Sequence, residues 1–110
     1  MSEPIFRPDN WVVLKVALPD EPVLYKVLAG WSATYTGGSS WRMNSGISIV
    51  FEREETVDFY GHSGSLYVCD KSQYRLRMNN IGTYNQLKKQ YGDAVEMMPE
   101  DTDWKKLVNL

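Results

Sequence analysis

Three short runs decide the fold: Ile47-Ser-Ile-Val-Phe-Glu-Arg53, Thr56-Val-Asp-Phe-Tyr60 and Ser65-Leu-Tyr-Val-Cys69. Each run is rich in β-branched and aromatic residues, and apolar and polar residues partly alternate along it, which is typical of β-strands. Glu54-Glu55 links the first two runs, and a glycine-containing turn links the last two. Short strands joined by tight turns predict an antiparallel β-meander that curls into a sandwich or a barrel.

Two further strands are expected before this meander. Trp11-Val-Val-Leu-Lys-Val-Ala-Leu18 and Val23-Leu-Tyr-Lys-Val-Leu-Ala29 are separated by Pro19-Asp-Glu-Pro22, whose prolines and aspartate favour a turn. The two strands are therefore predicted to form a hairpin. Residues 1–10 are expected to be an arm that is ordered only if its apolar residues dock on the sheet.

The pattern changes towards the C-terminus. Thr83-Tyr-Asn-Gln86 matches a capping box, in which the Thr hydroxyl and the Gln amide each bond a free backbone N–H. Gly92 stands where a helix-terminating glycine belongs, so we predict a helix over residues 83–91. A final turn or helix is expected at Trp104-Lys-Lys-Leu-Val108, and it must dock its Trp and Leu because it is too short to be stable alone.

Length and composition indicate one globular domain. The chain has 110 residues, of which 43% are apolar and 13% are aromatic. A chain of this length buries enough surface to fold without a disulfide or a metal ion. We predict a single mainly β domain of the α+β class over residues 1–110, with an arm at 1–10, the β-meander at 11–78 and a helical segment at 83–108.

Charge, cysteine content and hydropathy restrict the expected partners and cellular location of the protein. The net charge of −2 gives no bulk attraction to nucleic acid or to anionic lipid. Cys69 is the only cysteine, so no internal disulfide forms, and the residues around it predict an inert, half-buried thiol. We find no signal peptide and no apolar run long enough to cross a membrane. The expected location is the cytoplasm, with no membrane partner.

The segment from Trp31 to Gly46 is the candidate functional loop. Its aromatic residues alternate with glycines and small hydroxyl residues, and loops carry much of the function on rigid scaffolds. Aromatic rings stack on ligands and arginine binds phosphate or carboxylate. The alternative is that Trp31 and Trp41 are core residues that hold the loop in place. Tyr60 and His62 are expected near this loop. The candidate binding residues are therefore Trp31, Tyr35, Trp41, Arg42, Asn44, Tyr60 and His62.

No motif indicates catalysis or metal binding. His62 and Ser63 are adjacent, so on an extended chain their side chains point to opposite faces, and the segment does not match a G-x-S-x-G elbow. One histidine and one cysteine are too few for a zinc site without several carboxylates. The acidic residues between Glu52 and Asp58 lack the spacing of a calcium loop. We therefore expect no enzymatic activity, no metal and no cofactor.

The segment from Lys71 to Gly92 contains basic residues and no acidic ones. These residues either form ordinary solvated faces or gather into a small patch that binds an anion or a phosphate backbone. The patch would consist of Arg75, Arg77, Lys88 and Lys89.

Two blocks resemble motifs of small uncharacterised proteins from phages and mobile gene cassettes: Trp41-Arg-Met-Asn-Ser-Gly-Ile47 and Tyr60-Gly-His-Ser-Gly-Ser-Leu-Tyr67. The resemblance covers residues 11–78 and implies no established activity, so no functional residue is carried over from it. The order of strands also resembles that of SH3-like small barrels, in which the 31–46 segment would face a ligand. This analogy implies a partly open barrel, from which the C-terminal helix departs.

These observations favour a small non-enzymatic binding or accessory module that contacts a protein or peptide partner through residues 31–46. Homodimerisation is also expected, because so many rings are hard to bury in a chain of 110 residues. The first alternative is a single-stranded nucleic-acid-binding protein, and the second is a small enzyme that depends on His62.

Overall fold

The computed structural model describes residues 4–32 and 39–107, which form two four-stranded sheets and one α-helix. Antiparallel pairing dominates both sheets, so the predicted mainly β, α+β class is confirmed. The middle of the candidate loop, residues 33–38, lies outside the described residues. Within those residues, no helix is both long and apolar enough to cross a membrane.

The first sheet, called the helix-side sheet, has the strand order β4-β3-β2-β8. Its strands are β2 (Asn10–Val16), β3 (Leu24–Ser32), β4 (Ser39–Met43) and β8 (Val95–Met97). The pairing of β2 with β3 confirms the predicted hairpin. The sequence did not predict β8, because three residues are too few for a period-two pattern to be recognised.

The second sheet, called the distal sheet, has the strand order β1-β7-β6-β5. Its strands are β1 (Ile5–Phe6), β5 (Ile47–Glu52), β6 (Thr56–Gly61) and β7 (Leu66–Asp70). The antiparallel succession β5-β6-β7 is the predicted one. The N-terminal arm docks by pairing β1 in parallel with β7.

The predicted succession of strands is thus divided between two sheets. The chain crosses from one sheet to the other between β4 and β5, at residues 44–46. The two sheets do not close into a barrel, so the analogy with SH3-like barrels is left without support.

The principal core lies between the two sheets. Successive residues of a strand point to opposite faces, so alternate residues of β2 and β3 meet alternate residues of the distal sheet. Trp11, at the centre, packs against Phe59 of β6 and against Trp104 near the C-terminus. The buried apolar residues here are Trp11, Val13, Val27, Ala29, Ile47, Val50, Val57, Phe59, Tyr67, Cys69, Trp104 and Leu107.

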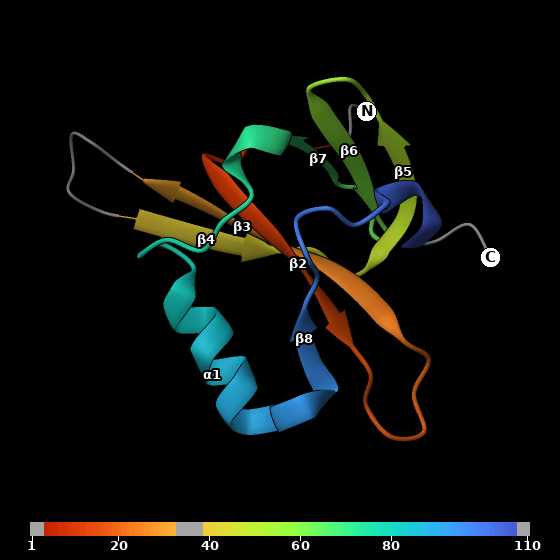
Figure 1. Ribbon diagram of the computed structural model, residues 1–110, viewed down its shortest axis with the longest axis vertical. Helices are drawn as coiled ribbons and strands as arrows, with labels where there is room; N and C mark the ends of the chain where they lie inside the picture. The colour runs from red at the N-terminus through yellow and green to blue at the C-terminus, as the bar shows by residue number, and fades with distance from the viewer. Residues whose placement is uncertain (1–3, 33–38, 108–110) are drawn as a thin grey trace.

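A second core covers the other face of the helix-side sheet. Figure 1 shows α1 (Ile81–Tyr91) along one side of this sheet and strands β5 to β7 on its other side. Strand β2 is therefore buried on both faces, which explains its almost unbroken apolar run. The second core consists of Val12, Leu14, Leu28 and Val95, with Met43, Tyr74, Leu76, Tyr84 and Leu87 packed against it.

Helix α1 begins two residues earlier than the capping box predicts. Thr83 lies inside the helix, and Asn80, at the N-cap position, makes no side-chain cap bond. The prediction for the helix end is confirmed: Gly92 has a φ of 59° and its N–H bonds the carbonyl of Lys88. A left-handed residue at this position is most easily a glycine.

The part of the chain that the structure describes also contains three short 3-10 helices: η1 (Lys71–Gln73), η2 (Gly92–Ala94) and η3 (Trp104–Leu107). The expected final turn corresponds to η3. It docks Trp104 and Leu107 into the principal core, as its shortness requires.

A buried cluster of three asparagines joins the segment before α1 to the helix-side sheet. Asn10 Nδ2 donates to Asn79 Oδ1 (3.0 Å) and Asn80 Oδ1 (3.2 Å), and Asn79 Nδ2 donates back to Asn10 Oδ1 (2.7 Å). Gly30 makes room for the cluster, since a Cβ there would lie 2.0 Å from Asn79 Oδ1. No local pattern predicts this cluster, because it joins residues about seventy positions apart.

Candidate functional site

The candidate loop residues divide between the two faces of β4. Trp41 lies opposite Gly30 and Arg42 lies opposite Ala29, so neighbouring side chains point to opposite faces. Because Ala29 belongs to the core between the sheets, Arg42 is on that side and the exposed Trp41 is on the helix side. These two residues therefore do not form one surface. Tyr35 lies outside the described residues.

Arg42 and Trp31 meet at Phe6. The guanidinium carbon of Arg42 lies 4.6 Å from the centre of the Phe6 ring, and the Trp31 ring packs edge-on to Phe6 at 6.1 Å. Trp31 Nε1 donates to the carbonyl of Arg7 (3.0 Å). These contacts fasten the N-terminal arm to the helix-side sheet and leave Arg42 exposed at the surface.

Asn44 fixes the segment of residues 44–46, where the chain passes from β4 in one sheet to β5 in the other. Its Oδ1 accepts from the N–H of Val27 (3.0 Å) while its own N–H donates to the Val27 carbonyl (3.2 Å). Its side chain is buried and packs over Gly61, where a Cβ would lie 3.4 Å from the Asn44 Cβ. Asn44 therefore has a structural role in this geometry, and it brings the two sequence blocks around Trp41 and Tyr60 into contact.

His62 lies against Gly46. The N–H of His62 donates to the Gly46 carbonyl (2.9 Å), and the N–H of Ser63 donates to Ser45 Oγ (3.1 Å). A Cβ on Gly46 would lie 2.7 Å from His62 Cδ2. The turn between β6 and β7 is thus fixed on residues 44–46, and the imidazole has a defined place.

His62 also lines a pocket of about 740 Å³, which we call the hairpin pocket. It lies between the end of the β2–β3 hairpin, the start of β5, the β6–β7 turn and η3. Its lining is mostly apolar, with a few polar side chains, which is typical of ligand sites. The lining residues are Lys15, Pro22, Val23, Leu24, Tyr25, Ile47, Ser48, His62, Lys106 and Leu107.

Tyr60 lies elsewhere, on the face of the distal sheet that points away from the core. Cross-strand partners share a face, and the register places Ile5, Leu66, Tyr60 and Ile49 in one row across all four strands. The next row is formed by Val68, Asp58 and Phe51. The two rows together are called the outer face.

The outer face is apolar and partly exposed. Ile5, Ile49 and Phe51 are 56%, 50% and 53% exposed, and Tyr60 packs edge-on to Phe51 at 6.0 Å. The apolar residues in this contiguous patch come from β1, β5, β6 and β7. Sequence reasoning missed the patch, although Ile49, Val50 and Phe51 already show that β5 is apolar on both faces.

One carboxylate lies in the middle of the outer face. Asp58 is only 7% exposed, and its Oδ2 accepts from Arg53 Nε at 2.9 Å. Its Oδ1 is buried and has no hydrogen-bond partner among the described residues. Burying a carboxylate oxygen without a donor is costly. Because Oδ1 is covered, a donor from outside the chain reaches this carboxylate from the side of Oδ2.

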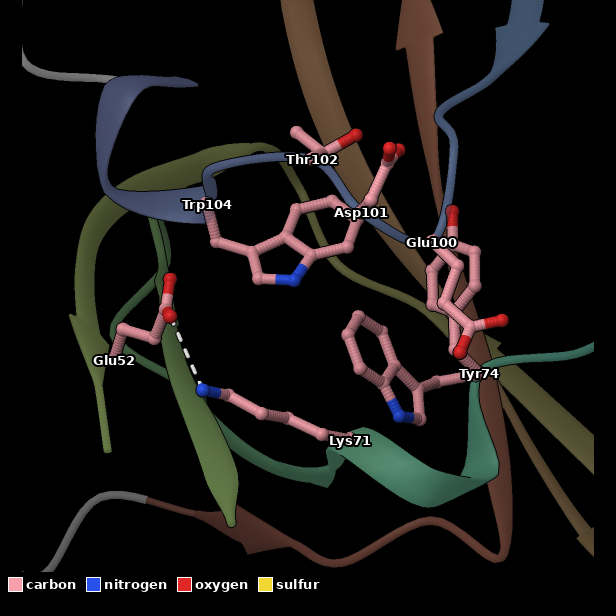
Figure 2. Close-up of a pocket in the computed structure, with 8 residues that line it drawn as sticks. Glu52, Lys71, Tyr74, Glu100, Asp101, Thr102 and Trp104 are labelled. Carbon is pink, nitrogen blue, oxygen red and sulfur yellow. Dashed lines mark hydrogen bonds and ion pairs between the residues drawn. The ribbon is translucent and has the colours of Figure 1, made fainter. Parts of the chain in front are cut away.

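Figure 2 shows another pocket, about 330 Å³ in volume, beside Trp104. Lys71 Nζ donates to Glu52 Oε2 across it (3.1 Å). The ring centres of Trp11, Tyr74 and Trp104 are 4.7 to 5.4 Å apart, so the rings pack on one another and leave no space for a cation between them. This pocket therefore lies beside an aromatic core cluster, and the Lys71–Glu52 ion pair spans it.

The four residues of the expected anion patch do not gather at one place. Arg75 and Arg77 precede α1, whereas Lys88 and Lys89 occupy its last turn, roughly 11 Å along the helix axis from its first residue. Two of the four are already bonded to the backbone: Arg75 Nη2 donates to the Ser72 carbonyl (2.8 Å) and Lys88 Nζ to the Val95 carbonyl (2.8 Å).

Metal and thiol chemistry receive no structural support. The described part of the chain contains no group of three His, Cys, Asp or Glu residues that could hold a metal ion. Cys69 is fully buried, not half-buried as predicted, and burial raises the pKa of its thiol well above the usual 9.0. A buried, protonated thiol is a poor nucleophile.

Comparison with protein families, with curated proteins and with solved structures finds no match to this chain. The resemblance to proteins of phages and mobile gene cassettes therefore stays a prediction. Function is inferred from the residues and their geometry alone.

Proposed function

We propose that this protein is a non-enzymatic protein-interaction module that binds a second copy of itself through the outer face. The observation that carries the proposal is the exposure of about half of Ile5 on β1 and of Ile49 and Phe51 on β5, the two edge strands of one sheet. Antiparallel sheets commonly turn polar residues to water, and a contiguous exposed apolar patch marks an interaction site.

Charge favours a second copy as the occupant. Arg53, whose side chain is 64% exposed, lies beside Asp58, whose Oδ1 lacks a donor among the described residues. In a two-fold dimer the same patch occurs on both copies, so Arg53 of one copy can donate to Asp58 of the other. The exchange gives each Asp58 carboxylate a donor from the other copy while the apolar rows pack together.

The outer face is small for a permanent interface. Four strands at about 4.8 Å spacing make it roughly 20 Å wide. We expect the area buried by each copy to fall below the ~800 Å² of a standard interface. The dissociation constant of the dimer is therefore expected in the micromolar range.

Sedimentation velocity over about a hundredfold concentration range around micromolar values tests this proposal. The wild type is expected to associate, and Ile49→Ser and Phe51→Ser to stay monomeric. Ile81→Ser is the matched control, because Ile81 is similarly exposed, at 42%, but begins α1. A wild type that is monomeric throughout, or Ile49→Ser associating as strongly as Ile81→Ser, would overturn the proposal.

The other hypotheses draw no support from the contacts. Nucleic-acid binding by the basic segment loses force because Arg75 and Lys88 are bonded to backbone carbonyls. A small enzyme that depends on His62 would need a base or acid beside the imidazole. Within residues 4–32 and 39–107, the imidazole makes no hydrogen bond to such a group. The 31–46 loop is described only at its two ends, so the outer face takes its place as the proposed interface.

A further inference from the structure

We propose that the hairpin pocket binds a small carboxylate that carries an apolar chain. This site is separate from the outer face and does not depend on the proposed dimer. Its volume of about 740 Å³ falls within the range usual for small-molecule sites.

The apolar part of the pocket selects an apolar chain. Val23, Leu24, Ile47 and Leu107 line it, and Val23 is 48% exposed at its mouth. Covering such side chains with a hydrocarbon chain removes apolar surface from water on both partners, which is favourable in proportion to the area.

The charged part of the pocket selects an anion. Lys15, His62 and Lys106 line it, and no Asp or Glu belongs to its described lining. An ammonium group only donates hydrogen bonds, and an imidazole has a donor in either charge state. Three donor side chains in the lining of one pocket suit a ligand whose polar head accepts hydrogen bonds.

Neighbouring carboxylates leave these donors free. Asp103 is 3.8 Å from Lys106 Nζ, in an ion pair between two exposed side chains, which is a weak contact. Glu96 lies opposite Lys15 in the β2–β8 register, yet the two charged groups are not within ion-pair distance. A ligand carboxylate therefore meets little competition from protein carboxylates for these donors.

The pocket wall fits a carboxylate better than a phosphate. Phosphate sites commonly add free backbone N–H groups or arginine to any lysine they use. No arginine lines the described pocket, and the amides of the adjacent turn are occupied, with Ser63 N–H bonded to Ser45 Oγ and Gly64 N–H to the Gly61 carbonyl. The contact of His62 with Gly46 holds one donor in place before a ligand arrives, which lowers the entropy cost of binding.

Isothermal titration calorimetry with sodium decanoate tests the inference, with decanol and sodium hexanoate as comparison ligands. We expect saturable binding of decanoate at one site per chain. Decanol lacks the anion and hexanoate lacks part of the chain, so each is expected to bind at least about tenfold more weakly. No saturable decanoate binding, or decanol binding as tightly as decanoate, would overturn the inference.

Variants locate the site. Lys15→Gln and Lys106→Gln are each expected to weaken decanoate binding about fivefold, whereas Lys89→Gln, in the last turn of α1, leaves it unchanged. Ile49→Ser is expected to bind decanoate like the wild type, because Ile49 lies on the outer face. Equal affinities for Lys15→Gln, Lys106→Gln and Lys89→Gln, or loss of binding in Ile49→Ser, would place decanoate outside the hairpin pocket and contradict the inference.

Discussion

The imidazole of His62 packs directly on the backbone of Gly46, with His62 Cδ2 at 2.7 Å from the position that a Cβ would occupy. Gly46 also has a φ of 138°, which side-chain-bearing residues rarely adopt. Two turns from different parts of the chain are joined at this contact, and His62 lines the hairpin pocket.

Gly46→Ala is expected to destabilise the protein by about 1 to 3 kcal/mol, because the new methyl group displaces His62 and the backbone becomes strained. Urea unfolding measures this change. Gly82→Ala is the control, since a Cβ at Gly82 in α1 meets nothing within 4 Å and the helix gains up to about 1 kcal/mol. Equal effects of the two substitutions would contradict the tight contact.

Asn80→Ala is expected to cost about 2 to 3 kcal/mol of stability, because it removes partners of buried polar groups. Asn80 Oδ1 accepts from the N–H of Arg77 (2.8 Å), and its Nδ2 bonds the Leu28 carbonyl (3.4 Å). Thermal unfolding of this variant is compared with that of Asn85→Ala, an exposed change on α1 with an expected effect within about 0.5 kcal/mol. Similar melting temperatures would rule out a structural role for the asparagine cluster.

Arg53→Gln is expected to weaken self-association about fivefold or more, because the exchanged bond to Asp58 of the other copy is lost. Sedimentation equilibrium gives the dissociation constants. Arg77→Gln removes an exposed arginine far from the outer face and is expected to leave the dimer unchanged. If the two variants dissociate alike, the arginine exchange does not occur.

The stability of the wild type is expected to fall as pH rises between 10.0 and about 12. Burial raises the pKa of Tyr74 from its usual 10.0 to about 12, so in this window the folded protein holds a proton that the unfolded chain has lost. Stability therefore decreases with pH there. In Tyr74→Phe the decrease measured by urea unfolding is expected to be smaller, and a slope identical to that of the wild type would contradict the buried hydroxyl.

Tyr74→Phe also has a direct cost that does not depend on pH. The Tyr74 hydroxyl accepts from the N–H of Val13 (3.2 Å) and donates to the Met98 carbonyl. Loss of these bonds is expected to lower stability by about 1 to 2 kcal/mol at neutral pH. This constant loss is measured at neutral pH, and the dependence of stability on pH is measured separately between pH 10.0 and about 12.

The strands and the helix were predictable because their signals are local. The runs that become β5, β6 and β7 have strand-like composition over five or six residues, and Gly92 marks the helix end by its own conformational freedom. The helix start was misplaced because the polar residue next to it, Asn80, bonds with Asn10 instead of capping the helix.

The sequence predicted some individual residues of the candidate site but not which of them lie together. His62 does line a pocket, but Tyr60 faces away from the core on another surface, and Trp41 and Arg42 are separated by the two faces of β4. Which element packs on each face of a strand depends on how the strands pair into sheets. The division of the strands between two sheets cannot be predicted from the residues of any single strand.

The sequence by itself determined the class of the fold, the approximate extents of most strands and the end of the helix, because chain propensity and alternation act over a few residues. Only the tertiary structure decided that Ile49 and Phe51 stay exposed, that Asp58 is buried among them and that Lys15 meets His62 at one pocket. These relations join residues far apart in the chain, and they arise from the packing of two sheets against each other.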